Sequence, residues 1–502
     1  MYIVTAKEMY EWDHYTIEEI GMDGRLLMEN AGRAIASRVM EIIKSQDQIT
    51  VFVGKGNNGG DGFVIARTLL NLNYNITVVQ IVPDEKITEE AAYHKQLFLN
   101  IGGHMTVTRD PEAIAELVGQ SDVVIDAMIG IGVHGPLREP VASIVSTINK
   151  KAACIIAIDI PTGLPADEGV TNFSAIQADY TFVIEAAKMS MFLQHTAPYY
   201  GAWEVVSIGI PVNKLAGDLQ CKIWEQRCFR QTLPKRDPYA HKGSHGKGLV
   251  IGGSSVMPGS IAMTAKAALR AGAGLLTIGT TGEAIVSIAP TCPEATYLKL
   301  DHSNESISLD HFDAIAIGMG LGRGRFAGKL VMQMVQTANV PLVIDADGLF
   351  HVKTDLSMLA KRSQPTIVTP HPGEMAMLLG ITIPELLVKP FHYAREFASS
   401  YQTYVVLKGK HTIITAPNGQ QAVNRTGNQG LAKGGSGDVL SGIVLAMLMQ
   451  HEHTFAALCN ACFIHGAAAD IQVEKNHSYY DLLATDVIDG IPDVYRTFLK
   501  KQ

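Results

Sequence analysis

The stretch GLAKGGSGDVLSGIVLAMLMQ, residues 430–450, joins a glycine-rich loop to an apolar helix. Five glycines fall within residues 430–442, and a single acid, Asp438, lies at the start of the predicted helix. Converging backbone N–H groups and the positive end of a helix dipole favour a bound anion. A carboxylate beside such a cradle can accept the proton of an attacking hydroxyl, as phosphoryl transfer requires. A simple helix cap needs only one or two glycines, so we interpret this stretch as a phosphate-binding loop.

Short apolar segments rich in β-branched residues alternate with predicted helices along the rest of the chain. Near-continuous apolarity of this kind is typical of a parallel sheet covered by helices on both faces. The segment QTLPKRDPYAHKGSHGKG, residues 231–248, interrupts the alternation, and the sequence predicts two α/β domains joined near residue 220. The predicted strands are 49–54, 76–82, 122–128, 154–160, 181–184 and 203–210 before the break, and 248–253, 274–279, 312–318, 341–347, 365–370 and 403–409 after it.

The composition narrows the class of protein. Of the 502 residues, 47% are hydrophobic and 18% are charged, with a net charge of −8, which argues against a partner that is nucleic acid or an acidic membrane. The start of the chain does not resemble a signal peptide, and no run reaches the roughly 18 apolar residues of a membrane helix. Cys459 and Cys462 lie in an apolar stretch predicted to be one buried helix, so we assign them to core packing. We expect a cytoplasmic protein, and its apolar helical surfaces favour a homo-oligomer.

The first half contains a dinucleotide-binding signature. GKGNNGGDG, residues 54–62, follows a predicted strand and has the GxGxxG spacing, and Asp84 lies close to where a ribose-binding acid belongs. However, Asp61 places a carboxylate inside the presumed phosphate turn. A Rossmann-type oxidoreductase therefore remains a competing interpretation.

Two further acids end predicted strands in the same half. Asp126 precedes IGIGVHGP, residues 129–136, and Asp159 precedes PTGLPADEG, residues 161–169. Neighbouring parallel strands would bring Asn58, Asp126 and Thr162 to one rim of the sheet. These are hard oxygen ligands, suited to a monovalent or divalent cation.

Four motifs of the second half carry a family resemblance. HKGSHGKGLVIGGSS (241–255), TPHPGE (369–374), VLKGKHT (406–412) and TGNQGLAKGGSGDVLSG (426–442) resemble the ADP/ATP-dependent NAD(P)H-hydrate dehydratases of the ribokinase-like superfamily. The resemblance spans residues 225–500 and implies a ribokinase-like three-layer α/β/α domain. It implies hydrate-binding residues Ser260, Gly320, His371 and Asp438, with Asp438 catalytic. It also implies that Mg²⁺ accompanies an adenine nucleotide held by Lys408, Gly409, Lys410, His411, Thr412 and Gly437.

Three motifs of the first half carry a second resemblance. NNGGDG (57–62), DAMIGIGVHGPLR (126–138) and DIPTGLPADEG (159–169) resemble the NAD(P)H-hydrate epimerase domain over residues 1–215, which implies a Rossmann-like three-layer fold. The resemblance implies K⁺ held by Asn58, Asp126 and Thr162, and we expect Asp159 to be the acid–base residue. The implied substrate contacts are Asn57, Asn58, Gly59, Gly60, Asp61, Gly130, Ile131, Gly132, Val133, His134, Gly135, Pro136 and Asp159.

Fused in this order, the two halves resemble the bifunctional NAD(P)H-hydrate repair enzymes. Hydration of the nicotinamide ring gives R and S hydrates, NADHX and NADPHX. We expect the first domain to interconvert them, and the second to dehydrate the S form with ADP or ATP through a phosphorylated intermediate. Two alternatives stay open at this point. The second domain could be a small-molecule kinase, for instance of a vitamin precursor, and the first could be a dinucleotide-binding module without catalytic activity.

Overall fold

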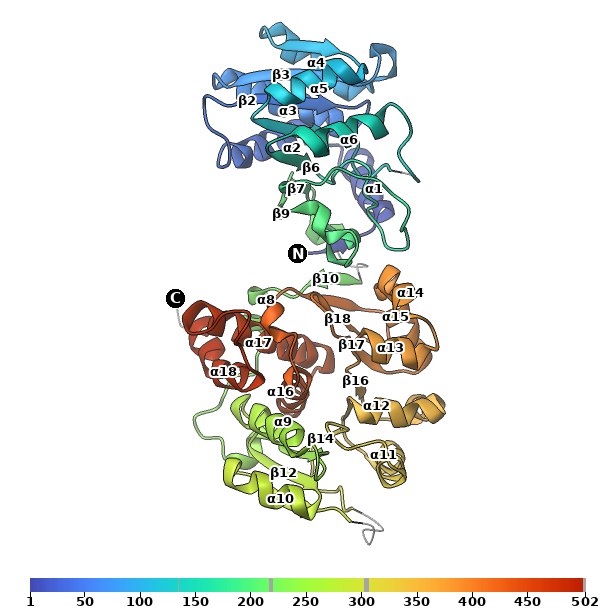
Figure 1. The fold of residues 1–502 in the computed structure, drawn as a ribbon, viewed down its shortest axis with the longest axis vertical. Coiled ribbons are helices and arrows are strands. Elements are labelled where there is room, and N and C mark those ends of the chain that lie inside the picture. Colours follow the sequence, from blue (N-terminus) through green and yellow to red (C-terminus); the bar gives the residue numbers. More distant parts are fainter. Residues whose placement is uncertain (134, 216–219, 302–306, 500–502) are drawn as a thin grey trace. The chain divides into compact units, whose positions relative to one another are not determined.

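The structure, a computed structural model, describes residues 1–133, 135–215, 220–301 and 307–499. The chain divides into two compact units, residues 1–219 (unit 1) and 220–502 (unit 2), and each has its own sheet and core (Figure 1).

In the described part of unit 1, the main sheet has seven strands in the order β4-β3-β2-β5-β6-β7-β9, all parallel. The order reverses between β2 and β5, and the loops that follow these two strands lie at the resulting crevice, where open α/β sheets bind ligands. A separate two-stranded ribbon pairs β1 with β8. The strands are β1 Ile3–Val4, β2 Gln48–Val53, β3 Asn75–Gln80, β4 His104–Val107, β5 Val123–Ala127, β6 Ile155–Ile158, β7 Tyr180–Ile184, β8 Ala187–Lys188 and β9 Ala202–Val206.

Helices cover both faces of this sheet. Val51 and Val53 of β2 face a core built with helices α2 and α3, whereas Phe52, between them, faces a core built with α5 and α6. Successive side chains of a strand point to opposite faces of the sheet, and both faces here are buried under helices. Each strand therefore appears in the sequence as a continuous apolar run. The helices are α1 Ala6–His14, α2 Gly24–Val39, α3 Asn57–Asn71, α4 Glu89–Asn100, α5 Pro111–Gln120, α6 Val141–Lys151 and α7 Val212–Leu215.

In the described part of unit 2, the sheet has ten strands in the order β10-β19-β18-β17-β16-β15-β14-β11-β12-β13. The pairs β17–β18 and β18–β19 are antiparallel, and the other pairs are parallel. The strands are β10 Cys221–Ile223, β11 Lys247–Ile251, β12 Leu275–Thr280, β13 Thr296–Lys299, β14 Ala314–Ile317, β15 Leu342–Ile344, β16 Thr366–Val368, β17 Tyr404–Leu407, β18 Thr412–Thr415 and β19 Gln421–Asn424.

The largest core of unit 2 lies between this sheet and helices α9, α16, α17 and α18, while α11, α12, α13 and α15 lie on the other side of the sheet (Figure 1). Gly442 of α16 lets this helix approach α9 closely, because a Cβ there would collide with the carbonyl oxygen of Thr264. The helices are α8 Gln226–Thr232, α9 Pro258–Arg270, α10 Gly282–Ile288, α11 Arg325–Thr337, α12 Asp347–Val352, α13 Pro372–Leu379, α14 Ile383–Val388, α15 Pro390–Ser400, α16 Ser436–Gln450, α17 Thr454–Lys475 and α18 Ala484–Phe498.

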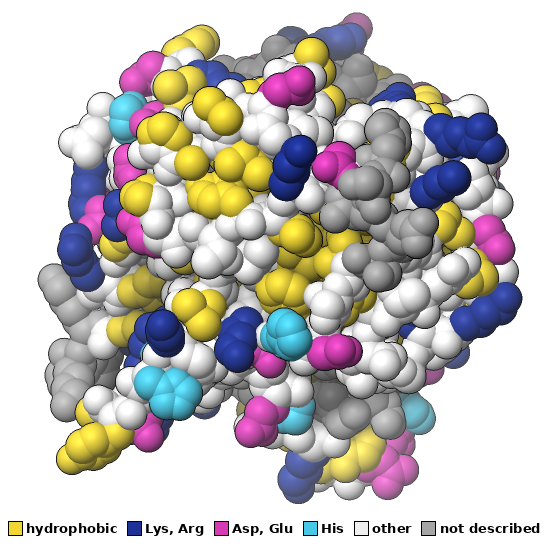
Figure 2. Space-filling view, turned by 90° about the horizontal axis from the view of Figure 1, so that it is seen from below, with side chains coloured by type: hydrophobic (Ala, Val, Ile, Leu, Met, Phe, Trp, Pro, Cys, Tyr) yellow, Lys and Arg dark blue, Asp and Glu magenta, His cyan; other side chains and the backbone are white. Residues whose placement is uncertain are grey.

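Helix α17 contains the cysteine pair. Cys459 and Cys462 are buried free thiols, as predicted for a core helix. By length and composition α17 could cross a membrane, yet 72% of its apolar window is buried inside the protein, which is also the property of a core helix. On the face drawn in Figure 2, Lys and Arg side chains alternate with Asp and Glu, so the coloured residues of that face form no patch of one sign.

The predicted α/β fold class is confirmed, and so are all twelve predicted strands, within a few residues at their ends. The predicted list did not include seven short strands, β1, β4, β8, β10, β13, β18 and β19. Residues of β4 and β13 are largely exposed or half-buried, so they lack the apolar run on which the prediction relied.

Two candidate active sites

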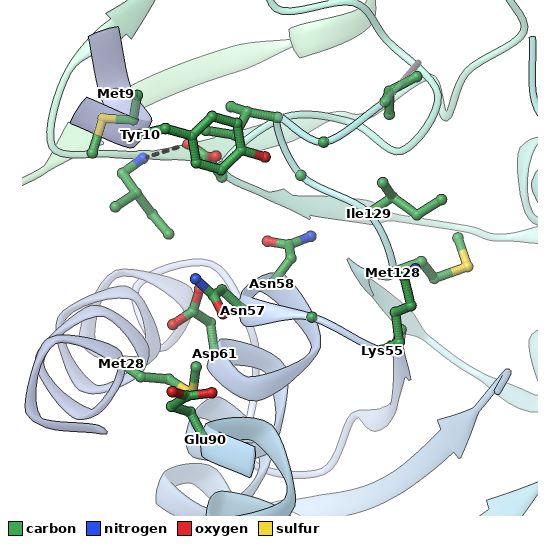
Figure 3. Close-up of a pocket in the computed structure, with 18 of the residues that line it drawn as sticks. Met9, Tyr10, Met28, Lys55, Asn57, Asn58, Asp61, Glu90, Met128 and Ile129 are labelled. Carbon is green, nitrogen blue, oxygen red and sulfur yellow. Dashed lines mark hydrogen bonds between the residues drawn. The ribbon is translucent and has the colours of Figure 1, made fainter. Parts of the chain in front are cut away.

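A cavity of about 790 Å³ opens at the crevice of unit 1. The loops after β2 and β5 line it, together with the end of β6 and helix α1. In Figure 3, Met9 and Tyr10 of α1 lie on one side of the cavity, and Asn57 and Asp61 of α3 lie on the opposite side. The cavity thus lies where the sheet topology places ligand sites in folds of this kind.

Asp159 is held rigidly at the edge of this cavity. Its backbone φ of +63° is rare for a residue with a side chain, and such strain clusters at functional sites. Its Oδ1 accepts hydrogen bonds from Lys188 Nζ at 3.0 Å and from the backbone N–H of Ile184 at 3.1 Å. Its Oδ2 lies 3.4 Å from the position that a Cβ on Gly130 would take, and therefore faces the cavity-lining loop.

Lys188, which positions Asp159, is completely buried. Besides Asp159, its ammonium group donates to the carbonyl oxygens of Ile184 at 3.0 Å and Ala186 at 2.8 Å. All three N–H bonds are therefore used, and the lysine forms an ion pair with Asp159 without being free to contact a ligand.

Of the three predicted cation ligands, Asn58 lines the cavity, whereas Asp126 and Thr162 are fully buried and do not line it. Asp126 is fully buried and accepts hydrogen bonds from Thr162 N and Oγ1, both at 2.7 Å, and burial raises its pKa to about 6. Among the described residues, no ion pair joins Asp126 to a Lys or Arg. Asn58 is also buried, and neither its amide oxygen nor its amide nitrogen has a hydrogen-bond partner within the described structure. A buried carboxylate without an ion-pair partner and a buried amide oxygen without a hydrogen-bond partner are both groups that a cation with oxygen ligands would satisfy.

Asp13 and Asp61 add two more carboxyl groups to the cavity lining. Burial, and then the charge of Asp159, raise the pKa of Asp13 to about 6. Burial, Asp159 and Asp13 raise the pKa of Asp61 well above its usual value. The cavity thus concentrates acidic groups near Asp159, whose carboxylate Lys188 partly balances.

Not every predicted contact of unit 1 lines the cavity. Gly59 packs against the backbone of Gly54, and Gly60 packs against Met28, so close that neither could carry a Cβ. His134 lies outside the described residues. The predicted residues that do line the cavity are Asn57, Asn58, Asp61, Gly130, Ile131, Gly132, Val133, Gly135, Pro136 and Asp159.

The structure argues against the oxidoreductase interpretation. Asp84, the presumed ribose acid, is engaged by Lys95 Nζ at 2.7 Å and by Gln80 Nε2 at 2.7 Å. It is therefore committed to protein contacts, whereas Asp61 of the glycine-rich turn is buried at the cavity.

In unit 2, the glycine-rich loop leads into α16 as predicted. Gly435 caps the helix with a φ of +92°, and Asp438 lies in the first turn. Asp438 is hydrogen-bonded to Ser260 at the start of α9. Gly320 lies against the same serine, because a Cβ on Gly320 would come within 2.9 Å of Ser260 Cβ. Three of the four predicted hydrate-binding residues therefore meet at one point.

Asp345, at the end of β15, connects the elements around this point. Its Oδ1 accepts a hydrogen bond from Lys408 Nζ at 2.9 Å, and its Oδ2 accepts one from Ser441 Oγ of α16 at 2.7 Å. The carboxylate is 1% exposed, and the residue after it, Ala346, has a strained φ of +47°. Asp345 thereby joins β15, the end of β17 and α16.

Lys408 carries the positive charge of the site. Its Nζ lies 3.3 Å from where a Cβ on Gly437 would be, and it is also 3.8 Å from Glu374 Oε2. The charges of Asp345 and Glu374 outweigh burial and raise the pKa of Lys408. A permanent ammonium group beside the glycine loop is suited to bind phosphate oxygens.

His371, the fourth predicted hydrate-binding residue, caps helix α13. Its Nδ1 accepts from the N–H groups of Gly373 at 3.0 Å and Glu374 at 3.2 Å, and its Nε2 lies 3.4 Å from Glu374 Oε1. Since Glu374 also lies near Lys408, His371 is connected to Lys408 by this glutamate. The remaining predicted nucleotide contacts, Gly409, Lys410, His411 and Thr412, form the turn between β17 and β18 and the start of β18.

Asp438 has the electrostatic environment of a base. Burial, and next the charge of Asp345, raise its pKa to about 6, although Ser260 and Lys408 lower it. A carboxylate with this pKa is largely ionised at neutral pH and accepts a proton more readily than an exposed aspartate does.

Comparisons with known proteins find matches for both units. A family model described as NAD(P)H-hydrate dehydratase matches residues 248–493, and one described as YjeF-related protein N-terminus matches residues 24–190. A bifunctional NAD(P)H-hydrate repair enzyme of Moorella thermoacetica is 34% identical and covers 99% of this chain and 97% of its own length. The corresponding Escherichia coli protein is 32% identical, over 97% of this chain and 92% of its own length.

Unit 2 also resembles a solved structure. The ADP/ATP-dependent NAD(P)H-hydrate dehydratase of Bacillus subtilis, co-crystallised with ATP and Mg²⁺, is 39% identical, with a TM-score of 0.50 over 55% of this chain and 98% of that one.

A Rossmann-like unit with an acidic cavity, joined to a ribokinase-like unit with a glycine-rich loop before helix α16, defines a two-domain enzyme of nucleotide chemistry. The chain belongs to the family of bifunctional NAD(P)H-hydrate repair enzymes, as the motifs predicted.

Proposed function

We propose that the chain repairs hydrated NADH and NADPH in two steps, one in each unit. Unit 1 interconverts the R and S hydrates. Unit 2 dehydrates the S hydrate at the expense of ADP or ATP and restores the reduced dinucleotide. The observation that carries the proposal is the position of Asp438, beside Ser260 and within the electrostatic reach of Lys408 and Asp345, at the start of a glycine-capped helix.

In unit 2, Asp438 removes the proton of the hydrate's hydroxyl group as that oxygen attacks the terminal phosphorus of the nucleotide. The bond between this phosphorus and the bridging oxygen breaks, and the nucleotide leaves with one phosphate fewer. Lys408 and the N–H groups around Gly437 stabilise the transferring phosphoryl group. The ring nitrogen's lone pair then expels phosphate, a far better leaving group than hydroxide, and loss of the neighbouring ring proton restores NAD(P)H.

The nucleotide enters together with Mg²⁺, as its substrate complex. Asp345, Glu374 and Asp438 place three carboxyl groups around a single described ammonium group, Lys408. Because phosphates add further negative charge to this cluster, a divalent cation bound with them offsets the repulsion.

In unit 1, Asp159 is the acid–base residue. Lys188 and the Ile184 N–H fix one of its oxygens and leave Oδ2 toward the cavity, where a hydrate's hydroxyl group would lie. The residues that would hold K⁺ are Asn58, Asp126 and Thr162, which fit it for the reasons given above. The ion would supply positive charge that balances Asp126.

The remaining predicted contacts retain these roles in the proposal: the cavity-lining residues of unit 1 hold the hydrate, and Lys408–Thr412 with Gly437 hold the nucleotide. We also propose a cytoplasmic location and self-association, as expected from the composition.

The test of this function separates the two steps. We expect Asp438→Asn to lower nucleotide-dependent recovery of reduced-nicotinamide absorbance by about 10²–10³-fold, since the base is lost. Exchange between R and S hydrates should persist in the same variant, and chromatography measures it. Substantial recovery of absorbance would eliminate Asp438 as the base, and a stable phosphate ester in place of free phosphate would identify a kinase instead.

A further inference from the structure

Two phosphate-bearing molecules, the nucleotide and the dinucleotide hydrate, meet at Asp438 in the function proposed for unit 2. Lys408 lies beside Gly437, on the side of the site that we assign to the nucleotide. The carboxyl groups of Asp345 and Glu374 lie 2.9 and 3.8 Å from its ammonium group and already balance its charge. Since the hydrate carries a pyrophosphate of its own, it needs a second cation on its own side of the site.

The loop after β14, residues 318–324, lies on the side assigned to the hydrate. A Cβ on Gly320 would come within 2.9 Å of Ser260 Cβ, and Ser260 is hydrogen-bonded to Asp438. Arg323 follows Gly320 by three residues, which is at most about 10 Å along the chain. In the hydrate, a single ribose links the nicotinamide ring to the pyrophosphate. A hydrate whose hydroxyl group lies at Asp438 therefore carries its pyrophosphate into the neighbourhood of this loop.

A second loop, residues 252–257 after β11, packs against the first. The N–H of Gly253 donates to the carbonyl oxygen of Met319 at 2.7 Å. This second loop contains no Lys or Arg, and the first contains only Arg323. Arg323 is therefore the one cationic side chain that these two loops can offer to a phosphate.

The guanidinium group of Arg323 is held in place although the side chain is 66% exposed. Its Nε donates to Asp347 Oδ1 at 3.1 Å, and its Cζ lies 4.7 Å from the centroid of the Phe350 ring. Neither Nη1 nor Nη2 has a hydrogen-bond partner among the described residues. The group is thus oriented through its inner nitrogen, while its two terminal nitrogens are available to a ligand.

The loop does not need the arginine to keep its shape. Gly322 is bonded on both sides of its backbone, since its N–H donates to Asp347 Oδ2 at 2.8 Å and its carbonyl oxygen accepts from His351 Nε2 at 3.0 Å. An arginine that is already oriented loses less conformational entropy when it binds a ligand than a free one does. Two terminal nitrogens in one plane match two oxygens of a phosphate group.

We propose that Arg323 binds a phosphate group of the hydrated dinucleotide through Nη1 and Nη2, while Asp347 and Phe350 hold its guanidinium group in place. This deepens the function proposed for unit 2 and rests on it. NADHX and NADPHX both contain the pyrophosphate, whereas only NADPHX contains a 2′-phosphate. The two substrates therefore distinguish which phosphate is bound.

The test is Arg323→Gln in the full chain, with Arg323→Lys as the conservative variant and Arg325→Gln as the matched control. Arg325 is an exposed arginine at the start of α11, two residues further on, and no described contact joins it to Asp347. Initial rates are measured with purified S-NADHX and S-NADPHX at saturating nucleotide. The nucleotide KM and the thermal unfolding temperature are measured in parallel.

We expect Arg323→Gln to raise the KM of both hydrates by about 10–100-fold, the effect of losing hydrogen bonds between charged groups. The kcat, the nucleotide KM and the unfolding temperature should stay close to those of the wild type. Arg323→Lys should give a smaller rise, because it keeps the charge but loses the planar pair of donors. Arg325→Gln should match the wild type. A rise confined to S-NADPHX would identify the 2′-phosphate as the bound group.

An unchanged KM for both hydrates in Arg323→Gln would overturn the proposal. An equal rise in Arg325→Gln would also overturn it, because the effect would then be one of general charge. A rise in the nucleotide KM alone would assign Arg323 to the other substrate, and a lower kcat together with a lower unfolding temperature would show a structural role. If the wild type leaves the S hydrate unchanged with both ADP and ATP, the function proposed for unit 2 fails by itself, before any variant is compared.

Discussion

At the scale of single residues, Asp345 determines how strongly Asp438 holds a proton. The negative charge of Asp345 is, after burial, the largest cause of the raised pKa of Asp438. A general base must be ionised, so dehydration should decline as the pH falls through about 6, the pKa of Asp438.

We expect Asp345→Asn to move this decline to lower pH, because the variant removes the charge that disfavours ionised Asp438. The nucleotide KM should also rise, since Lys408 loses the negative charge of its partner at 2.9 Å and is positioned less firmly. The measurement is the pH dependence of the initial rate with saturating S hydrate.

Ser441→Ala is the matched control for this prediction. It removes the 2.7 Å hydrogen bond to Asp345 and keeps the charge, so the pH of half-maximal rate should stay where it is. An unshifted profile in Asp345→Asn would show that burial alone determines the pKa of Asp438.

Motifs in the sequence predicted the site only where chemistry is carried by short, recognisable segments. Asp438, Lys408 and Asp159 were found in this way because each lies where a strand or glycine loop ends. Lys188 was missed, since a lysine at the end of a two-residue strand looks like an ordinary surface residue in the sequence. Only the packing of the chain shows that this lysine lies beside Asp159.

At the scale of elements, the contact between α9 and α16 depends on a glycine. Gly442→Ala should destabilise unit 2 by about 1–3 kcal/mol, since a methyl group would collide with the Thr264 carbonyl oxygen and separate the two helices. Chemical denaturation measures the change.

Gly259→Ala is the matched control, because this glycine of α9 has no atom within 4 Å of the added Cβ. We expect its stability to change little or to rise by up to about 1 kcal/mol, as alanine favours a helix. Equal destabilisation by both substitutions would contradict the packing argument.

The elements themselves were predicted well because their cores lie on both faces of each sheet. Strands such as β2 and β5 are buried along nearly their whole length, and burial leaves an apolar run in the sequence. The order of the strands was not predicted, since the same runs are compatible with several crossovers. The ligand-lining loops were predicted as loops, but which of their residues face the cavity follows from the crossover between β2 and β5.

At the scale of the whole molecule, unit 1 should respond to K⁺. The folded unit raises the pKa of Asp126 to about 6, above its value in the unfolded chain, so stability falls as the pH rises from about 4 to 6. K⁺ bound to the ionised form would offset this loss.

We therefore expect K⁺ to raise the thermal unfolding temperature of unit 1, relative to tetramethylammonium at equal ionic strength, and to do so most above pH 6. Asp126→Asn should abolish the difference. Asp179→Ala, which loses a 2.8 Å hydrogen bond from the Ile155 N–H, should lower stability but retain the K⁺ effect. If K⁺ still raises the unfolding temperature of Asp126→Asn, then Asp126 is not a ligand of the ion.

The separate cores of the two units predict that they can work apart. A fragment of residues 216–502 should fold, dehydrate the S hydrate and leave the R hydrate except for its slow spontaneous exchange. Adding a fragment of residues 1–215 should restore consumption of the R hydrate. Chromatography of both hydrates over time checks this, and rapid use of the R hydrate by the larger fragment alone would refute it.

The burial of Lys188 has one more consequence. An amine that is wholly enclosed and has no free N–H bond cannot react with an acylating reagent while unit 1 is closed. The rate at which Lys188 is labelled therefore measures how often the structure around Asp159 unfolds locally. Mass spectrometry of the peptide that contains this lysine would give that rate.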